Sequence, residues 1–156
     1  MIIELIIIEI ESNSGIEKMK DRIITYREMC DFINIDSIQK GMNFHIKGNI
    51  SVILMSVRSG APYDDEIDEV NNLLIYEGHD VPKTLLNPSP KEIDQKIYTK
   101  TGKLTENGKF IKAVDKYKKG IEEPEKVLVF EKLKRGIWSE KGLFILIDYA
   151  IEISNN

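Results

Sequence analysis

Two tyrosines, Tyr63 and Tyr76, flank an acidic loop that contains Glu66. A pair of aromatic rings can sandwich a planar base, and a carboxylate can accept hydrogen bonds from an exocyclic amine. The acidic loop falls between two predicted strands, and long or functional loops often hold ligands. The sequence therefore predicts a pocket for a flat heterocycle, and the residue types alone leave the identity of that ligand open.

Other kinds of chemistry have weaker signals. The two histidines, His45 and His79, are far apart, and the chain has no HExxH, CxxC or EF-hand spacing. The acidic run at residues 64–69 is either a solvated loop or a divalent-cation site, although it lacks the spaced ligands and glycine of a calcium loop. No glycine-rich phosphate loop is present. We expect no metal, no cofactor and no catalytic residue, with a metal-dependent nuclease as one alternative.

The charge of the chain is unevenly distributed. The formal net charge is −4, which by itself argues against a polyanionic ligand. Residues 96–141, however, contain thirteen Lys or Arg against seven Asp or Glu, so this stretch carries +6 and the remainder −10. A negatively charged partner is therefore expected to dock on the second half of the chain. Candidate contacts to a DNA backbone are Lys100, Lys103, Lys109, Lys112, Lys132, Lys134 and Arg135.

Composition indicates one globular unit in a reducing compartment. With 156 residues, 42% hydrophobic and 31% charged, the chain is long enough to bury a core. The single cysteine, Cys30, excludes an internal disulfide and a thiolate zinc cluster. The apolar N-terminus contains glutamates and lacks preceding basic residues, so we interpret it as a buried strand, without a membrane partner. We expect a cytoplasmic location.

Hydrophobic periodicity predicts many strands and few helices. The expected strands span residues 2–10, 44–57, 73–76, 126–133 and 142–149, and the expected helices span residues 16–34 and 105–120. Strands and helices do not alternate, which favours an α+β fold with a curled, barrel-like sheet over a parallel α/β fold. Residues 1–40 are expected to form a strand and helix bracing a main domain at residues 41–156, with the whole chain as one compact unit.

Several segments in order carry a resemblance to a known family. They are SVILMSVRSGAPYDDEID, LLIYEG, DQK, KVLVFEKLKRGIW and GLFILIDY, between about Gly41 and Tyr149. Together they resemble the SRA (SET- and RING-associated, or YDG) domain, in particular prokaryotic forms coupled to HNH-type restriction endonucleases. The resemblance implies a PUA-like β-barrel that binds duplex DNA and flips 5-methyl- or 5-hydroxymethylcytosine into its concave face. It implies no enzymatic activity in this chain.

The resemblance also assigns roles to residues. Tyr63 and Tyr76 match the stacking pair, and Glu66 matches the carboxylate that reads the Watson-Crick edge, with Asp65 as the candidate if the register is one residue off. The backbone wall of the pocket corresponds to Ser59, Gly60 and Ala61, and the architectural Asp-Gln pair corresponds to Asp94 and Gln95.

The chain departs from the family at two points. The family carboxylate is usually aspartate, and residues 79–93 are proline-rich where eukaryotic members carry a basic finger. The resemblance implies a recognition module of a modification-dependent restriction or defence system, with a nuclease on another domain or chain. An RNA- or nucleotide-binding PUA-like module is the other alternative. The exact modification, the sequence context and the oligomeric state stay open.

Overall fold

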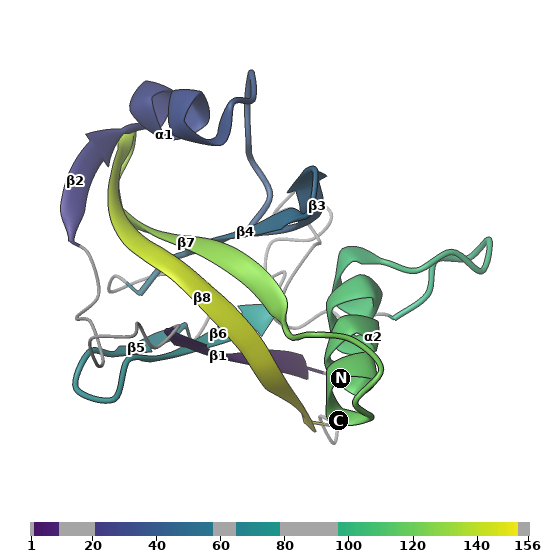
Figure 1. The fold of residues 1–156 in the computed structure, drawn as a ribbon. Coiled ribbons are helices and arrows are strands. Elements are labelled where there is room, and N and C mark those ends of the chain that lie inside the picture. Colours follow the sequence, from purple (N-terminus) through teal and green to yellow (C-terminus); the bar gives the residue numbers. More distant parts are fainter. Residues whose placement is uncertain (1, 10–20, 58–64, 79–96, 153–156) are drawn as a thin grey trace.

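The computed structural model describes residues 2–9, 21–57, 65–78 and 97–152. The strands are β1 (Ile2–Glu9), β2 (Arg22–Thr25), β3 (Met42–Lys47), β4 (Ile50–Met55), β5 (Glu66–Asp68), β6 (Leu73–Gly78), β7 (Glu125–Lys134) and β8 (Ile137–Glu152). The helices are α1 (Tyr26–Ile33) and α2 (Glu106–Lys118). The predicted α+β class is confirmed, with a mixed sheet and two helices (Figure 1).

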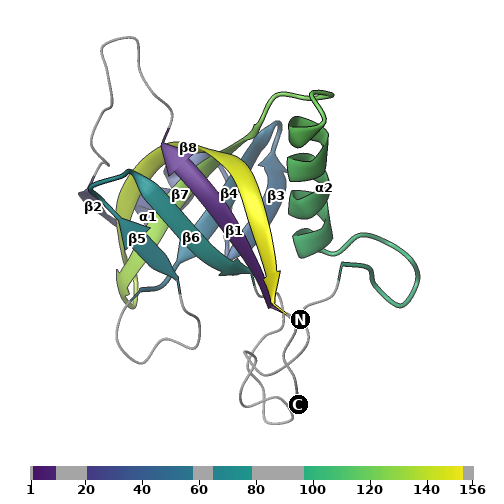
Figure 2. The same cartoon turned by 90° about the horizontal axis from the view of Figure 1, so that it is seen from below.

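The strands form one curled sheet in the order β3-β4-β7-β8-β1-β6-β5, with β2 paired to β8. The β4–β7 pair is parallel and the other pairs are antiparallel. Figure 2 shows β1 and β6 lying across the interior from β4 and β7. Among the described residues no pairing joins the edge strands β3 and β5, so the sheet is curled without a closed hydrogen-bonded ring.

The sheet carries a separate hydrophobic cluster on each face. On β4, Ile53 and Met55 enter the cluster inside the curl, while Val52 and Leu54 enter the cluster beneath α1. This alternation is the two-residue period of a strand, and burial on both faces explains the continuous apolar run in the sequence. The inner cluster also receives Phe110 from α2. α2 lies beside one end of β8, and β2 with α1 lies at the other (Figure 1).

The N-terminal strand belongs to the same sheet as the rest of the chain. β1 lies between β8 and β6, and Leu5 is fully buried in the inner cluster. The expectation of a strand at residues 2–10 is therefore confirmed for the described residues 2–9. The strand is an interior member of the sheet rather than an external brace.

The helix predicted at residues 16–34 is wrong at residues 22–25 and confirmed at residues 26–33. Residues 22–25 form β2, and the helix begins only at Tyr26, because Thr25 and Glu28 form a capping box. Ile23 and Ile24 fit a helical spacing, but their β-branched side chains also suit a strand, and pairing with β8 decides between the two. Residues 16–20 lie outside the described residues.

Four further predictions can be compared with the structure. The expected strand at residues 44–57 is a hairpin, β3 and β4, in which Gly48 adopts a φ of 61° between the strands. The expected helix at residues 105–120 is confirmed: Thr105 caps the first turn by accepting from the Gly108 amide, and Gly120 with a φ of 73° follows the helix. The strands expected at 126–133 and 142–149 are confirmed as parts of β7 and β8.

Candidate functional site

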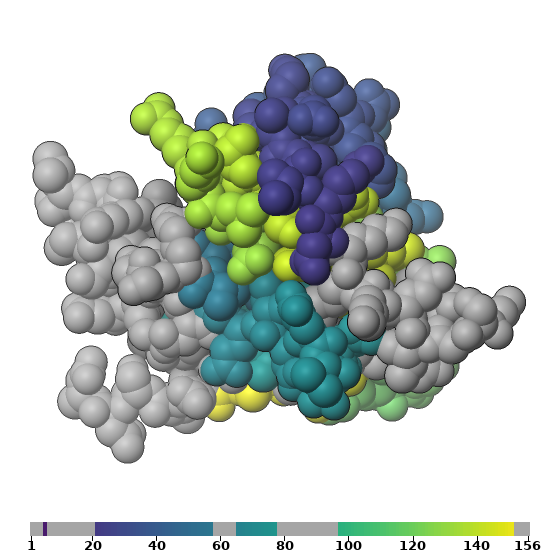
Figure 3. Space-filling view, turned by 90° about the vertical axis from the view of Figure 1, so that its left-hand side faces the viewer, coloured from purple at the N-terminus to yellow at the C-terminus, as the bar shows by residue number. Residues whose placement is uncertain are grey.

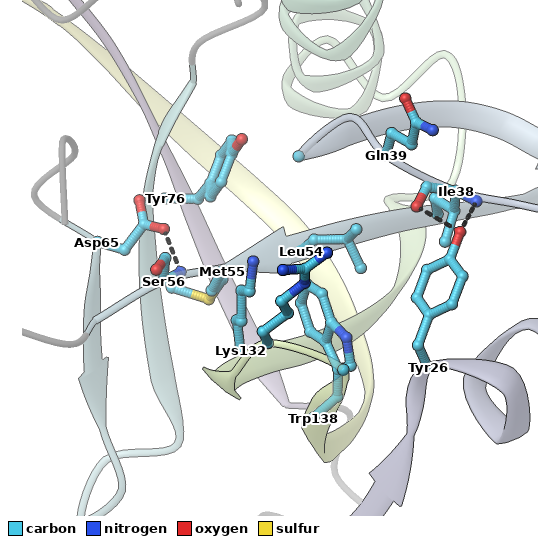
Figure 4. Close-up of a pocket in the computed structure, with 13 residues that line it drawn as sticks. Tyr26, Ile38, Gln39, Leu54, Met55, Ser56, Asp65, Tyr76, Lys132 and Trp138 are labelled. Carbon is cyan, nitrogen blue, oxygen red and sulfur yellow. Dashed lines mark hydrogen bonds between the residues drawn. The ribbon is translucent and has the colours of Figure 1, made fainter. Parts of the chain in front are cut away.

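A cavity of about 670 Å³ lies where four segments of the chain meet. They are the end of β4, the β5–β6 pair, the tip of the β7–β8 hairpin, and α1 with the segment that follows it. Figure 4 shows side chains from these segments pointing toward a common space. The volume falls within the range of pockets that hold small ligands. The residues that line it include a carboxylate, aromatic rings and cations.

Asp65 and Tyr76 form one wall of the cavity (Figure 4). Asp65 is buried, and its carboxylate accepts hydrogen bonds from the backbone amides of Ser56 (2.8 Å) and Glu77 (3.0 Å). These two bonds fix the orientation of the carboxylate between the end of β4 and β6. A carboxylate in this place is a hydrogen-bond acceptor at the cavity wall.

The ring of Tyr76 is held close to the backbone of Gly41. Tyr76 is only 2% exposed and belongs to the inner cluster, yet it borders the cavity. A methyl group added at Gly41 would lie 2.1 Å from the Tyr76 hydroxyl oxygen. The absence of a side chain at Gly41 therefore sets how far the phenol reaches along this wall.

The β7–β8 hairpin supplies the cationic wall. Lys132 and Trp138 are paired across the two strands, and the Lys132 ammonium lies 5.9 Å from the centre of the indole ring. Exposed Arg135 and Gly136 at the turn also line the cavity. The surface of this hairpin borders both the dark blue β2–α1 region and the teal β5–β6 region (Figure 3). Positive charge thus lies beside the pocket opening.

Tyr26 holds the remaining wall in place. Its hydroxyl donates to the Ile38 carbonyl (3.0 Å) and accepts from the Ile38 amide (2.9 Å), which fixes the segment carrying Gln39 (Figure 4). The Tyr26 amide donates to the Gly136 carbonyl (2.9 Å), so the helix start is also tied to the hairpin turn. The aromatic and amide side chains of this wall are consequently positioned by the backbone.

The structure brings together only some of the predicted pocket residues. Tyr76 and Asp65 line the cavity. Glu66 is exposed on β5 and is not among the cavity residues, because successive side chains of a strand point to opposite faces. The carboxylate at the cavity is therefore that of Asp65, the candidate for a register one residue off. The remaining predicted pocket residues lie outside the described residues: Tyr63, Ser59, Gly60, Ala61, Asp94 and Gln95.

The predicted DNA-backbone cations fall into two groups. Lys132 and Arg135 line the cavity, and exposed Lys134 lies between them in sequence. The other four belong to α2 and the turn before it, and none of them lines the cavity: Lys100, Lys103, Lys109 and Lys112. Within this second group Lys109 is paired with Glu106 at 3.3 Å. The structure thus places the hairpin cations, and not the helix cations, at the candidate site.

Sequence reasoning missed three parts of the cavity. Tyr26 and Gln39 were not expected there, and Trp138 was noted only as part of the GIW segment. Tyr26 and Trp138 are more than a hundred residues apart, so their proximity depends on the β2–β8 pairing. One signal was available in the sequence. Arg135 and Gly136 form a turn between two predicted strands, and a hairpin at that turn pairs Lys132 with Trp138.

An ion network surrounds the buried Lys141 on β8. The Lys141 ammonium is 3.4 Å from Glu131 and also contacts Asp21, with Glu69 at 3.9 Å. Burial acts to lower the pKa of Lys141, but the hydrogen bond to Asp21 and the charge of Glu131 outweigh it, so the pKa is raised. Lys141 therefore stays charged and ties β8 to segments far apart in the chain.

In the part of the chain that the structure describes, no group of three or more His, Cys, Asp or Glu side chains is arranged to hold a metal ion. Within the same residues, no helix is both long and apolar enough to cross a membrane. Comparison with known proteins gives no match to a family model, to a curated protein or to a solved structure. The geometry of the cavity is therefore the basis for a functional interpretation.

Proposed function

We propose that this chain binds duplex DNA and holds a flipped 5-methyl- or 5-hydroxymethylcytosine in the cavity. In this proposal the curled sheet is a PUA-like barrel of the SRA type. The observation that carries it is the convergence of the Asp65 carboxylate, the Tyr76 ring and the cations of the β7–β8 hairpin on one cavity. Each corresponds to one requirement of base flipping: reading an edge, stacking, and neutralising phosphate.

Asp65 is the proposed reader of the base. The exocyclic amine of cytosine is a donor, and a carboxylate is its usual acceptor. Thymine presents a carbonyl at the same place, so the carboxylate would repel it, and a pocket that leaves a polar group unpaired rejects the wrong ligand strongly. Asp65 replaces Glu66 in this role because Asp65 is the residue whose side chain borders the cavity.

Aromatic stacking and phosphate contacts supply the affinity. Extruding a base costs a few kcal/mol, and each aromatic stack returns about 1–3 kcal/mol. Tyr76 and Trp138 are aromatic side chains that line the cavity and could supply such a stack. Lys132 and Arg135 are placed to contact the phosphates beside the flipped nucleotide, which makes binding depend on salt. Cleavage, in a restriction or defence system, would belong to another domain or chain.

The test is a binding panel with one duplex that carries plain, 5-methyl-, 5-hydroxymethyl- or glucosylated cytosine at a single site, read by fluorescence anisotropy. We expect tighter binding to the methyl or hydroxymethyl duplex than to the plain one. Asp65→Asn should weaken binding to the modified duplexes toward the level of the plain one, because the flipped base loses the contact at its amine, and Glu66→Gln, at the next residue, should leave binding unchanged. Equal preference in both variants would refute the assignment of Asp65.

Two further arms separate the alternatives. Single-stranded RNA of the same sequence should compete poorly; tighter binding to RNA than to every duplex would favour an RNA-binding module. Incubation of modified plasmid with Mg²⁺ should leave the plasmid intact, and cutting by the purified chain would indicate a nuclease. Circular dichroism of Asp65→Asn confirms that a lost preference reflects the pocket and not an unfolded chain.

A further inference from the structure

The hydrophobic cluster beneath α1 is only partly covered. α1 buries Met29, Cys30 and Ile33 against the outer face of β4 and β7, including Phe130. The helix has eight residues and ends at Asn34, which adopts a left-handed conformation with a φ of 66°. Around the last residues of α1, apolar side chains of β4, β7 and β8 stay partly exposed: Ile50, Leu128 and Leu143.

An apolar groove of about 500 Å³ occupies this uncovered part of the sheet. It lies among Phe32, Ile33, Ile50, Leu128 and Leu143, which come from α1, β4, β7 and β8. Phe32 is 52% exposed, and Ile50 and Leu143 are each 40% exposed. Large apolar side chains gathered around one concave surface mark an interaction site, whereas single exposed ones do not.

Of the described residues that line the groove, the charged ones are two lysines. Lys47 on β3 and Lys126 on β7 border it, and both are exposed. Within the described residues no ion pair joins either lysine to a carboxylate. The whole chain carries a formal charge of −4, so a purely cationic rim is a local departure from the average surface. An occupant with acidic groups complements it.

We propose that this groove docks a partner protein through an acidic amphipathic helix. The large apolar side chains of that helix would enter between Phe32 and Leu143, and its carboxylates would pair with Lys47 and Lys126. An amphipathic helix binds such a groove by inserting apolar side chains spaced three or four residues apart, and its charged side chains fix the register. The aromatic Phe32 at its edge is the type of residue that contributes most at such interfaces.

The groove and the cavity lie at opposite ends of the same strands. On β7, Lys126 lines the groove and Lys132 lines the cavity, about 20 Å away at roughly 3.3 Å per residue. On α1, Tyr26 faces the cavity and Phe32 the groove. A partner in the groove would therefore leave the cavity open, and both sites can be filled at once.

The experiment uses the full chain and a labelled synthetic helix with leucine and phenylalanine on one face and glutamate elsewhere. A matched peptide has lysine in place of every glutamate. We expect the acidic peptide to bind in fluorescence anisotropy and the basic peptide to bind at least ~10-fold more weakly. The Lys47→Glu/Lys126→Glu double variant should lose at least ~10-fold in affinity for the acidic peptide. The Lys112→Glu/Lys119→Glu variant has the same charge change on α2 and should bind normally.

Backbone amide chemical shifts locate the peptide on the wild-type chain without any substitution. The proposal requires shifts at Phe32, Ile50, Leu128 and Leu143. No binding, equal binding of both peptides, an unchanged affinity of the lysine variant, or shifts confined to other residues would each overturn it. A concentration-dependent dimer that Leu143→Glu abolishes would overturn it too, because the occupant would then be a second copy of this chain. None of these readouts depends on DNA binding.

Discussion

Replacing Gly41 with alanine should destabilise the protein through a single atom of Tyr76. The added methyl group would lie 2.1 Å from the Tyr76 hydroxyl oxygen, whereas ordinary contacts begin at 3.4 Å. The oxygen must therefore move by about 1.3 Å, and Tyr76 is buried in the inner cluster, where neighbours resist the movement. Overpacking of this kind costs about 1–3 kcal/mol in the free energy of unfolding.

Removal of the hydroxyl group should reverse most of this loss. In Tyr76→Phe the nearest ring atom to the new methyl group is Cζ at 3.2 Å, a contact that a shift of a few tenths of an ångström relieves. We expect Tyr76→Phe alone to cost about 1 kcal/mol as a lost polar interaction. The Gly41→Ala/Tyr76→Phe double variant should then be more stable than the sum of the single changes predicts, by about 1 kcal/mol or more.

Urea denaturation of the four proteins measures this coupling. Gly108→Ala is a matched control, because its methyl group would lie 2.3 Å from the backbone oxygen of Ile97 and no change at Tyr76 can relieve that clash. Gly108→Ala and Tyr76→Phe should therefore add. If Gly41→Ala and Tyr76→Phe also add, the close approach of Tyr76 to Gly41 does not govern the position of the ring, and the reasoning is refuted.

Three further predictions concern charge. Lys132→Ala/Arg135→Ala should reduce the steepness of log affinity for DNA against log salt by about 1.8, because two phosphate contacts are lost. Lys100→Ala/Lys112→Ala should reduce it less. Equal effects of the two variants would show that the hairpin is not the main phosphate contact. Lys141→Met should lower the free energy of unfolding by about 1–3 kcal/mol at pH 7, measured in urea, because it leaves the half-buried Glu131 without its cation, and an unchanged stability would contradict the network. Since the pKa of Lys141 is raised above its ordinary 10.5, its contribution is present below that pH and is lost as the pH rises through the folded-state pKa, so the wild type should lose its advantage over Lys141→Met only in strongly alkaline solution.

Local patterns in the sequence were enough to predict α2 and most strands. Thr105 and Gly120 mark the ends of α2, and the alternation and continuity of apolar residues mark β7, β8 and β4. The β2–α1 boundary could not be found by periodicity, because Ile23 fits both a helical face and a strand. Pairing with β8, more than a hundred residues away, makes this segment a strand and not a helix. Tertiary contacts override local preference at this point.

The candidate site was predictable only in part for the same reason. Tyr76 and Asp65 are close in sequence, so motif order placed both near a pocket. The choice between Asp65 and Glu66 depends on strand register, because a shift of one residue moves every side chain to the opposite face of the sheet. Trp138 and Tyr26 reach the cavity through long-range pairing and leave no local motif.

The parallel contact between β4 and β7 has a consequence for how the chain must be synthesised and handled. Ser51 is paired with Val127, 76 positions later, and within the described residues β4 has only β3 as its other neighbour. Closing so long a span is slow compared with forming a hairpin, because its entropy is lost before the contacts form. A truncated product that stops before residue 125 would expose the apolar strand β4 along an unpaired edge, where it is prone to aggregate.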